Sequence, residues 1–239
     1  MKIGDWEGIA LIIGAGGIGR YIHDYLKNNC PKMDVILCGR LNNNDGGIYL
    51  DLENDESFKS FENHLSVLRK PLRLVINTSG FLHSNLIKPE KRLAHVSRSI
   101  AVKNLSINAI APILIAKSVE KFIRPDFPFS FASMSARVGS ISDNRLGGWY
   151  SYRASKAAQN QFLKTLSIEW RRKYPLSIVT ILHPGTCDTK LSKPFQSRVP
   201  KGKLFTPAQS SEYLLNIISE QNPTDSGKFL AWDNTIIPW

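Results

Sequence analysis

The sequence is poor in cysteine and contains no long apolar run. Its 239 residues include 3 cysteines, Cys30, Cys38 and Cys187, none of them in a Cys-x-x-Cys pair. An odd number of unpaired cysteines disfavours a disulfide framework and a zinc knuckle, and indicates a reducing compartment. No uninterrupted apolar stretch reaches the roughly 18 residues of a membrane-spanning helix, and the first residues lack the pattern of a signal peptide. We therefore expect a cytoplasmic protein without a membrane partner.

Acidic residues are scarce relative to basic ones. The chain has 31 Lys+Arg against 20 Asp+Glu, a formal net charge of +11. Such an excess is typical of proteins that bind nucleic acid, an anionic surface or a phosphorylated ligand. The basic residues are scattered, however, and the densest group, 171–173, is too short to be a basic tail. We therefore expect no nucleic-acid partner and favour a phosphorylated small ligand.

Metal-binding patterns are also missing. The 5 histidines include no His-x-x-x-His pair, so we expect no metal site. Among the histidines we consider only His183 as a ligand contact, because it directly precedes Pro184 and Gly185.

What the sequence does contain is a regular alternation of short apolar runs and longer amphipathic stretches. Strand-like runs lie at 9–13, 35–38, 72–77, 129–133, 178–182 and 229–232, and helical patterns at 18–28, 57–68, 91–102, 107–122, 152–174 and 207–219. This alternation predicts βαβ units and a mostly parallel sheet. We find no linker and no repeat, and therefore predict an α/β fold, a doubly wound parallel sheet in a single Rossmann-type domain over residues 1–239.

The least regular segment is 186–207, which contains Pro194, Pro200 and Gly202. A surface loop is the simplest interpretation. A loop of this length in a compact domain is often a lid over a site, and the sequence leaves both interpretations open.

The first apolar run ends in Gly14-Ala-Gly-Gly-Ile-Gly19, which matches the pattern Gly-x-Gly-x-x-Gly at Gly14, Gly16 and Gly19. Glycines permit a tight turn in which backbone N–H groups approach a pyrophosphate, and the helix that follows offers its positive dipole end. The motif alone is weak evidence, but here it follows an apolar strand and opens a helix. We predict a dinucleotide-binding turn that includes Gly17 and Ile18.

The end of the second strand indicates which dinucleotide is bound. Folds that bind NAD place an acidic residue there to hold the ribose 2′-hydroxyl, whereas this strand ends Cys38-Gly39-Arg40. An arginine can pair with a 2′-phosphate instead, and Arg20 could add a second cation. We predict NADP(H) as the cofactor. The alternative is that Arg40 is a solvated loop residue.

A tyrosine and a lysine lie four residues apart in the longest helical pattern. Tyr152 and Lys156 share one face of this predicted helix. An ammonium group near a phenol favours the phenolate and lowers the pKa of the tyrosine. A tyrosine tuned in this way can act as a general acid or base. The spacing is common by itself, and an exposed pair on an amphipathic helix would look the same.

The pair is accompanied by other motifs, which are more specific evidence than the pair alone. Together they form seven landmarks in the order found in the short-chain dehydrogenase/reductase family. They are the glycine turn, Asp51-Leu52, Asn77-Thr-Ser-Gly80, Asn108, a serine segment before Gly139, Tyr152-x-x-x-Lys156, and Pro184-Gly185-x-x-x-Thr189. The chain resembles this family from Ile9 to its end. Residues 141–149 and 151–158 are most similar to a carbonyl-reductase-like branch that includes C-factor-type signalling proteins.

The resemblance implies a set of catalytic residues. Tyr152 exchanges a proton with the carbonyl or alcohol oxygen, while Lys156 holds the nicotinamide ribose and lowers the pKa of Tyr152. A serine donates a hydrogen bond to the substrate oxygen. Asn108 anchors a water in the proton path to Lys156.

The resemblance also implies cofactor contacts along the chain. Asp51 contacts the adenine, Asn77 and Gly80 line the adenosine side, and Thr189 approaches the nicotinamide carboxamide. The predicted cofactor-binding residues are Gly14, Gly16, Gly17, Ile18, Gly19, Arg40, Asp51, Leu52, Asn77, Gly80, Tyr152, Lys156, Pro184, Gly185 and Thr189. Helices 91–122 and 152–174 are where family members usually pair, so the resemblance implies a homodimer or homotetramer.

The sequence departs from the family pattern at two points. The glycine turn is one residue shorter than usual, with Ile13 where the family has threonine. The family's serine stands three residues before the glycine that corresponds to Gly139, and that position is Ala136. A shift of one residue on a strand turns a side chain to the other face. Either a local irregularity brings Ser135 into place or the serine role is weakened; we predict Ser135.

Several aromatic residues are candidates for a substrate pocket. Trp149, Phe195 and Phe205 could line it, although aromatics at such positions also close cores. We expect Cys187 to be a small packed residue and not a nucleophile. The main prediction is an NADP(H)-dependent oxidoreductase that interconverts a small-molecule carbonyl and alcohol. The alternative is a dinucleotide-binding regulatory or signalling protein with little turnover.

Overall fold

A parallel sheet of seven strands forms the centre of this computed structural model, which describes residues 3–41 and 46–239. The strand order is β3-β2-β1-β4-β5-β6-β9, and every neighbouring pair is parallel. The strands are β1 Gly8–Ile13, β2 Met33–Gly39, β3 Ile48–Tyr49, β4 Leu72–Asn77, β5 Phe129–Met134, β6 Ser177–His183 and β9 Lys228–Ala231. The predicted doubly wound parallel sheet in a single Rossmann-type domain is confirmed, apart from residues 1–2 and 42–45, which lie outside the described residues.

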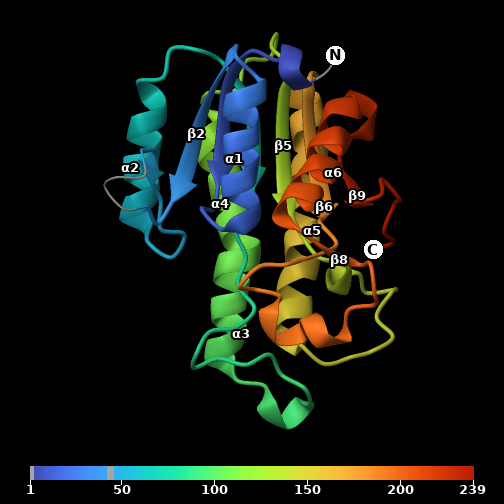
Figure 1. The fold of residues 1–239 in the computed structure, drawn as a ribbon. Helices are drawn as coiled ribbons and strands as arrows, with labels where there is room; N and C mark the ends of the chain where they lie inside the picture. The colour runs from blue at the N-terminus through green and yellow to red at the C-terminus, as the bar shows by residue number, and fades with distance from the viewer. Residues whose placement is uncertain (1–2, 42–45) are drawn as a thin grey trace.

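Helices cover both faces of this sheet (Figure 1). They are α1 Gly17–Asn29, α2 Asp55–Ser66, α3 Arg98–Leu105, α4 Ala111–Glu120, α5 Tyr150–Lys173 and α6 Pro207–Glu220. Short 3₁₀ turns span Ile3–Asp5, Leu93–His95, Arg137–Gly139, Lys193–Arg198 and Pro223–Asp225. Because strand side chains alternate between faces, the sheet contributes to two separate apolar clusters.

The alternation is clearest in β1, which is buried along its whole length. Ile9, Leu11 and Ile13 pack with α2, α4 and α5, whereas Ala10 and Ile12 pack with α1 and α6. A strand covered on both faces needs apolar residues at every position, and this explains the continuous apolar run in the sequence.

The strand order shows where along the sheet a ligand site is expected. After β1 the chain moves outward to β2 and β3, and then returns to β4 on the other side of β1. The carboxyl ends of β1 and β4 therefore form a topological switch point, where ligands of such folds bind. Figure 1 shows α3 and the start of α5 extending beyond this edge.

One predicted helix is wrong over its first half. Residues 91–97 form no α-helix and contain only the 3₁₀ turn Leu93–His95. α3 begins at Arg98 because Ser97 has extended backbone angles and its side-chain oxygen accepts the Ile100 N–H at 3.3 Å. Ser97 is thus the N-cap, and the helical pattern before it is coincidental.

The helical run Arg98–Glu120 contains a π-helical segment, Ser106–Ile110, between α3 and α4. With a mean hydropathy of 1.5, this run is long and apolar enough to cross a membrane by length and composition alone. Core helices pass the same test, and this run packs against α2 and α5 in the domain. Its Asn104 and Asn108 are buried and hydrogen-bonded.

The segment 186–207 contains its own small sheet. β7 Thr186–Cys187 pairs in parallel with β8 Leu204–Phe205, and the 3₁₀ turn Lys193–Arg198 lies between them. Residues from the whole segment line the cavity described next. Both ends of the segment are therefore fastened to each other over the carboxyl edge of the sheet.

Candidate active site

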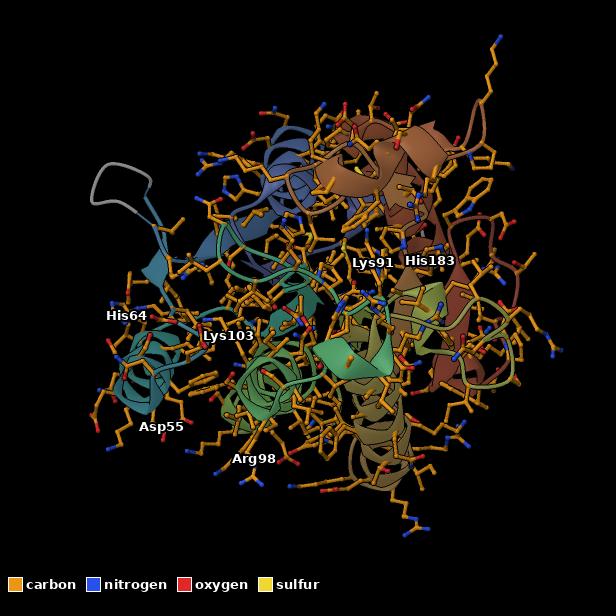
Figure 2. All side chains as sticks on the ribbon, turned by 90° about the horizontal axis from the view of Figure 1, so that it is seen from below. Asp55, His64, Lys91, Arg98, Lys103 and His183 are labelled. Atoms are coloured by element: carbon orange, nitrogen blue, oxygen red, sulfur yellow. The ribbon has the colours of Figure 1, made fainter. Side chains whose placement is uncertain are left out.

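A cavity of about 1860 Å³ lies along the carboxyl edge of the sheet. One end, the glycine-turn end, is lined by residues 14–21 and by the segments that follow β2 and β3. The other end, the tyrosine end, is lined by residues 134–138, 146–149 and the first turns of α5. Figure 2 looks onto this edge from below, with His183 near its centre.

The glycines of the turn serve two different purposes. A Cβ on Gly19 would lie 1.9 Å from the Gly14 carbonyl oxygen, and a Cβ on Gly14, whose φ is +104°, would lie 2.6 Å from Thr78 Oγ1. These two positions need glycine so that β1, α1 and β4 can approach one another. Gly16 is different, because a Cβ there meets nothing within 4 Å. Gly16 therefore keeps the cavity open.

The start of α1 suits an anion. Gly16 is its N-cap and provides no side-chain cap, so the first N–H groups of the helix and its positive dipole end are available at the cavity. Thr189 approaches this turn, since its Cγ2 lies 3.3 Å from the Cβ position of Gly17. Backbone donors, an uncapped helix start and an open cradle together fit the pyrophosphate of a dinucleotide.

The loops after β2 and β3 complete the glycine-turn end. Arg40 is exposed and lines the cavity, and no acidic residue stands at the tip of β2. Asp51 and Leu52 line the same region, and one Asp51 carboxylate oxygen accepts the Glu53 N–H at 3.1 Å. The Arg40 guanidinium is a phosphate-binding group, and the Asp51 carboxylate is a hydrogen-bond acceptor.

Tyr152 and Lys156 lie on the buried face of α5 and line the tyrosine end, 7% and 2% exposed. The Lys156 Nζ donates to the Met134 carbonyl at 2.8 Å and to Gln159 Oε1 at 2.9 Å. It lies 5.9 Å from the centre of the Tyr152 ring. The helix thus brings the predicted pair together, but the lysine is held by other partners.

Burial dominates the titration of both groups. It lowers the pKa of Lys156 to about 7, and it raises the pKa of the Tyr152 phenol. The expectation that Lys156 lowers the pKa of Tyr152 is therefore not met in this arrangement. A low-dielectric site disfavours both charged forms, and Lys156 makes no hydrogen bond to the phenol that would offset this effect.

Ser135 continues the ladder of β5 beyond Met134, because its N–H donates to the Leu182 carbonyl at 2.7 Å. Its side chain is 4% exposed and lines the cavity, and its hydroxyl donates to Asn160 Oδ1 at 2.6 Å. Ser133 lies deeper and is bonded to Asn77 and Gln159 at 2.9 and 2.8 Å. Of the two serines, only Ser135 reaches the cavity.

Two predicted site residues do not line the cavity. Asn77 is fully buried, and its amide holds Ser133 and Ser79. Asn108 lies in the π-helical segment, where its amide donates to the Phe81 carbonyl and accepts the Phe81 N–H, at 2.8 and 2.7 Å. Asn108 also donates to Ser155 Oγ at 3.0 Å and so ties the segment after β4 to α5. π-Helical turns of this kind are frequent at functional sites.

The remaining predicted residues do line the cavity. They are Gly14, Gly16, Gly17, Ile18, Gly19, Arg40, Asp51, Leu52, Gly80, Ser135, Tyr152, Lys156, Pro184, Gly185 and Thr189. His183 lines it as well, and burial lowers the pKa of its imidazole to about 4. Burial raises the pKa of the Cys187 thiol to about 11, which disfavours a reactive thiolate.

The sequence analysis missed Gln159 and Asn160. Both are buried and follow Lys156 by three and four residues, so that they lie on the inner face of α5. The sequence did contain a signal for them, because their spacing from Lys156 places two polar side chains on the helix face that is expected to be buried. Gln159 positions Lys156, and Asn160 positions Ser135.

Aromatic residues form one wall of the tyrosine end. The Trp149 ring lies 4.7 Å from Phe195 and 6.1 Å from Tyr152, between centroids. Both Trp149 and Phe195 line the cavity. Phe205 packs on Trp232 instead, at 4.7 Å, and closes the core beneath Gly185. Two of the three candidate aromatics are therefore at the cavity.

No protein-family model matches the chain. The C-signal protein of Myxococcus xanthus is 31% identical over 148 residues, which cover 62% of this chain and 83% of that protein. The 1-hydroxy-2-glutathionyl-2-methyl-3-butene dehydrogenase of Rhodococcus sp. is 27% identical over 190 residues, which cover 80% and 78%. The matched residues thus cover most of the length of each relative.

Among solved structures, the NADPH-bound carbonyl reductase from chicken fatty liver superimposes with a TM-score of 0.81. The match covers 98% of this chain and 99% of that one at 21% identity, a level that concerns the fold alone. The ordered motifs, the parallel sheet and the similarity to the Myxococcus protein agree: this chain belongs to the short-chain dehydrogenase/reductase family of oxidoreductases.

Proposed function

We propose that this protein is a cytoplasmic NADP(H)-dependent oxidoreductase that interconverts a carbonyl and an alcohol on a small molecule. The proposal rests above all on one observation: Tyr152, Lys156 and Ser135 line the same cavity as the glycine turn. The glycine turn would hold the pyrophosphate of a dinucleotide at one end of this cavity, and the three side chains line its other end. The NADPH of the chicken carbonyl reductase and the dehydrogenase activity named for the Rhodococcus relative support it.

The glycine-turn end provides the contacts for the cofactor. The N–H groups at the start of α1 suit the pyrophosphate, and Arg40 suits the 2′-phosphate, since a guanidinium binds phosphate through paired hydrogen bonds. The Asp51 carboxylate suits an adenine amino group. Pro184, Gly185 and Thr189 also line the cavity, and Thr189 lies against Gly17.

When bound, the nicotinamide supplies or accepts the hydride. Tyr152 donates the matching proton to the carbonyl oxygen during reduction, and takes it from the alcohol during oxidation. Because burial raises the pKa of Tyr152, the phenol is protonated at neutral pH and ready for reduction. The Tyr152 ring lies edge-on to Trp149, 6.1 Å between centroids.

Lys156 acts on both the cofactor and the tyrosine. Its Nζ is held at the cavity wall by the Met134 carbonyl and Gln159 Oε1, where it would donate to a ribose hydroxyl group of the bound cofactor. Burial lowers the pKa of Lys156 to about 7, so that the amine changes charge near neutral pH. Its Nζ lies 5.9 Å from the centre of the Tyr152 ring, so that the charged form places a positive charge beside the ring.

Ser135 is the proposed hydrogen-bond donor to the substrate oxygen. Its hydroxyl now donates to Asn160 Oδ1, while Asn160 Nδ2 is buried without a partner among the described residues. Rotation of the amide by half a turn lets Nδ2 donate to Ser135 Oγ and leaves a carbonyl oxygen unpaired, which costs less than an unpaired N–H. The Ser135 hydrogen is then free to bind the substrate. Asn160 is therefore the residue that sets the direction of the Ser135 hydroxyl.

The test is NADPH oxidation, followed at 340 nm, with a panel of aldehydes, ketones and quinones. Tyr152→Phe removes the proton donor and should lower kcat/KM for reduction by about 10²- to 10⁴-fold. The affinity for NADPH should change little, because the ring remains. A Tyr152→Phe enzyme as active as the wild type would overturn the proposal.

A second candidate is a dinucleotide-binding regulator with little turnover. Ala136 at the usual serine position favours it, as does the resemblance to the Myxococcus C-signal. This candidate predicts tight NADPH binding with no reduction of any compound on the panel. It also predicts that Tyr152→Phe alters neither binding nor any downstream response.

A further inference from the structure

The tyrosine end of the cavity has a rigid aromatic wall. Trp149 has a φ of 52°, a left-handed conformation that is strained for a bulky residue. Its N–H donates to the Glu90 carbonyl at 2.5 Å, and the buried Glu90 carboxylate accepts both the N–H and the hydroxyl of Ser151. Strain of this kind persists only where surrounding contacts impose it, and it concentrates at ligand sites.

The loop before Trp149 is fastened as well. The Arg153 guanidinium donates to the carbonyls of Gly147, Gly148 and Val138, at 3.2, 3.0 and 3.3 Å. The ring of Trp149 is therefore held against Phe195 before any ligand arrives. The two rings, tilted by 58° to each other, form an apolar surface suited to an aromatic or otherwise apolar substrate body.

The charged residues that line this end of the cavity all carry positive charge. Those closest in the chain to the aromatic wall and to Tyr152 are Lys91, Arg137, Arg153, Lys156 and Arg198, and Lys190 and Lys203 of the segment 186–207 line the cavity as well. The acidic residues of the cavity wall, Asp24, Asp51 and Glu53, belong to α1 and to the segment after β3, at the glycine-turn end. Glu90 is close to Trp149 but is engaged with Ser151 and does not line the cavity.

Three of these five cations already have partners. Arg137 pairs with Asp143 at 3.0 Å, Arg153 is bound by backbone carbonyls, and Lys156 is held by Met134 and Gln159. Lys91 and Arg198 are the exceptions, since neither forms an ion pair or hydrogen bond with any side chain in the described part of the chain. Lys91 and His183, both labelled in the view onto this edge in Figure 2, both line the cavity.

Both unpaired cations adjoin the aromatic wall. Lys91 Cα lies 4.0 Å from the Cβ position of Gly148, directly before Trp149. Arg198 ends the 3₁₀ turn that carries Phe195. Neither Glu90 nor Asp143, the carboxylates close to this wall, lines the cavity, and each is engaged with another residue. Two unpaired cations at an apolar wall produce a positive potential that attracts an anion.

We propose that the substrate is an apolar or aromatic carbonyl compound that carries a carboxylate, which Lys91 and Arg198 bind while the carbonyl oxygen faces Tyr152. A guanidinium matches a carboxylate through two parallel hydrogen bonds, and an ammonium group adds a point charge. This inference rests on the proposed oxidoreductase function and names the substrate class for it. It also gives part of the excess positive charge of the chain a role beyond the cofactor.

The experiment compares acid and ester probes that differ only in this charge. The probes are 4-formylbenzoate with its methyl ester, and 4-oxo-4-phenylbutanoate with its methyl ester, which present the carboxylate at two distances. We expect a higher kcat/KM for the acid of at least one pair. Lys91→Met or Arg198→Met, each of which removes one cation, should lower the ratio of kcat/KM for the acid to kcat/KM for the ester about fivefold. This factor is the one expected for the interaction of two unit charges about 4 Å apart in a water-like medium. The double variant should lose both contributions.

Lys88→Met and Lys201→Met are the matched controls. Both lysines are exposed, neighbour the two proposed residues in sequence and do not line the cavity. They should leave the acid-to-ester ratio unchanged. The preference for the acid should also weaken as salt is raised from 0.05 to 0.5 M, because screening acts on the charge alone.

A binding measurement separates this inference from the proposed function. Calorimetric titration of each probe into protein saturated with NADP⁺ requires no turnover. Acid binding that exceeds ester binding, and that falls in the two variants, supports the inference even if neither probe is reduced. Equal binding of acid and ester, no detectable binding of either, or an acid preference that survives in the double variant would each overturn it.

Discussion

The two ends of the cavity are built in different ways. The glycine-turn end consists largely of backbone: glycines 14, 16 and 19, the start of α1 and the loops after β2 and β3. The tyrosine end consists of side chains from distant segments, among them Lys91, Ser135, Trp149 and Phe195. A site made of backbone leaves a compact motif in the sequence, whereas a site made of converging side chains does not.

The strongest contrast lies within the glycine turn itself. Gly19→Ala should lower the free energy of unfolding by about 3 kcal/mol, the upper range for overpacking, because its Cβ would lie 1.9 Å from the Gly14 carbonyl oxygen. Gly16→Ala should leave stability within about 1 kcal/mol and weaken NADPH binding instead, since this Cβ enters open cavity. Urea unfolding and calorimetric titration measure the two effects. Equal stabilities for both variants would remove the distinction between packing and cofactor glycines.

The next effect concerns the tyrosine end. Ser135→Ala should lower kcat/KM for reduction by about 100-fold, in line with the loss of one oxyanion donor at the weaker end of its range. Asn160→Leu should cost a similar factor if Asn160 acts through Ser135, and the double variant should then be no worse than either single one. Additive losses in the double variant would show that Asn160 acts independently. Asn160→Gln serves as the conservative control for the amide.

A substitution of Arg40 tests the glycine-turn end of the cavity. Arg40→Asp removes the proposed partner of the 2′-phosphate and introduces a carboxylate for a ribose hydroxyl. We expect the ratio of NADPH to NADH affinity to fall by about tenfold or more, as for the loss of one charge-assisted pair. Arg40 is exposed, so the melting temperature should not change. An unchanged cofactor preference would identify Arg40 as a solvated loop residue.

The last effect concerns stability and not activity: it is the pH dependence of stability that Lys156 contributes. Burial lowers its pKa from 10.5 to about 7. Between these values the unfolded chain binds more protons at this site than the folded one, so stability rises with pH across the window. Lys156→Met lacks this contribution, and its Tm relative to the wild type should fall by several degrees from pH 7 to pH 10, at about 3 °C per kcal/mol for a domain of this size.

The exposed Lys88→Met provides the reference for that measurement. Its Tm difference from the wild type should be the same at both pH values. A Lys156→Met difference that is likewise constant would mean that the amine keeps an ordinary pKa in the folded protein.

Much of the fold follows from local sequence patterns. The prediction for β4 matches its observed bounds, and the other predicted strands differ from the observed ones by one or two residues at either end. The short β3 and the β7–β8 pair were missed, because two-residue strands leave no periodicity. The helical pattern over 91–97 was misleading, because Ser97 caps α3 and local capping overrides periodicity.

Candidate site residues were predictable where each belongs to a local motif. Tyr152 and Lys156 lie together because one helix carries both, and the glycine turn forms because one strand leads directly into one helix. The asparagines were harder to place. Asn77 belongs to a motif, yet it turns inward to hold Ser133. Which way a strand-end side chain points depends on its neighbours in the sheet.

The sequence by itself determined the α/β alternation, the dinucleotide turn and the Tyr-Lys pair, because each depends on contacts within one or two consecutive elements. Only the tertiary structure decided that Ser135 reaches the cavity and Ser133 does not, that Lys156 is held by Gln159, and that Lys91 and Arg198 adjoin one aromatic wall. These arrangements join residues far apart in the chain. Their energies depend on burial and on partners that no local pattern specifies.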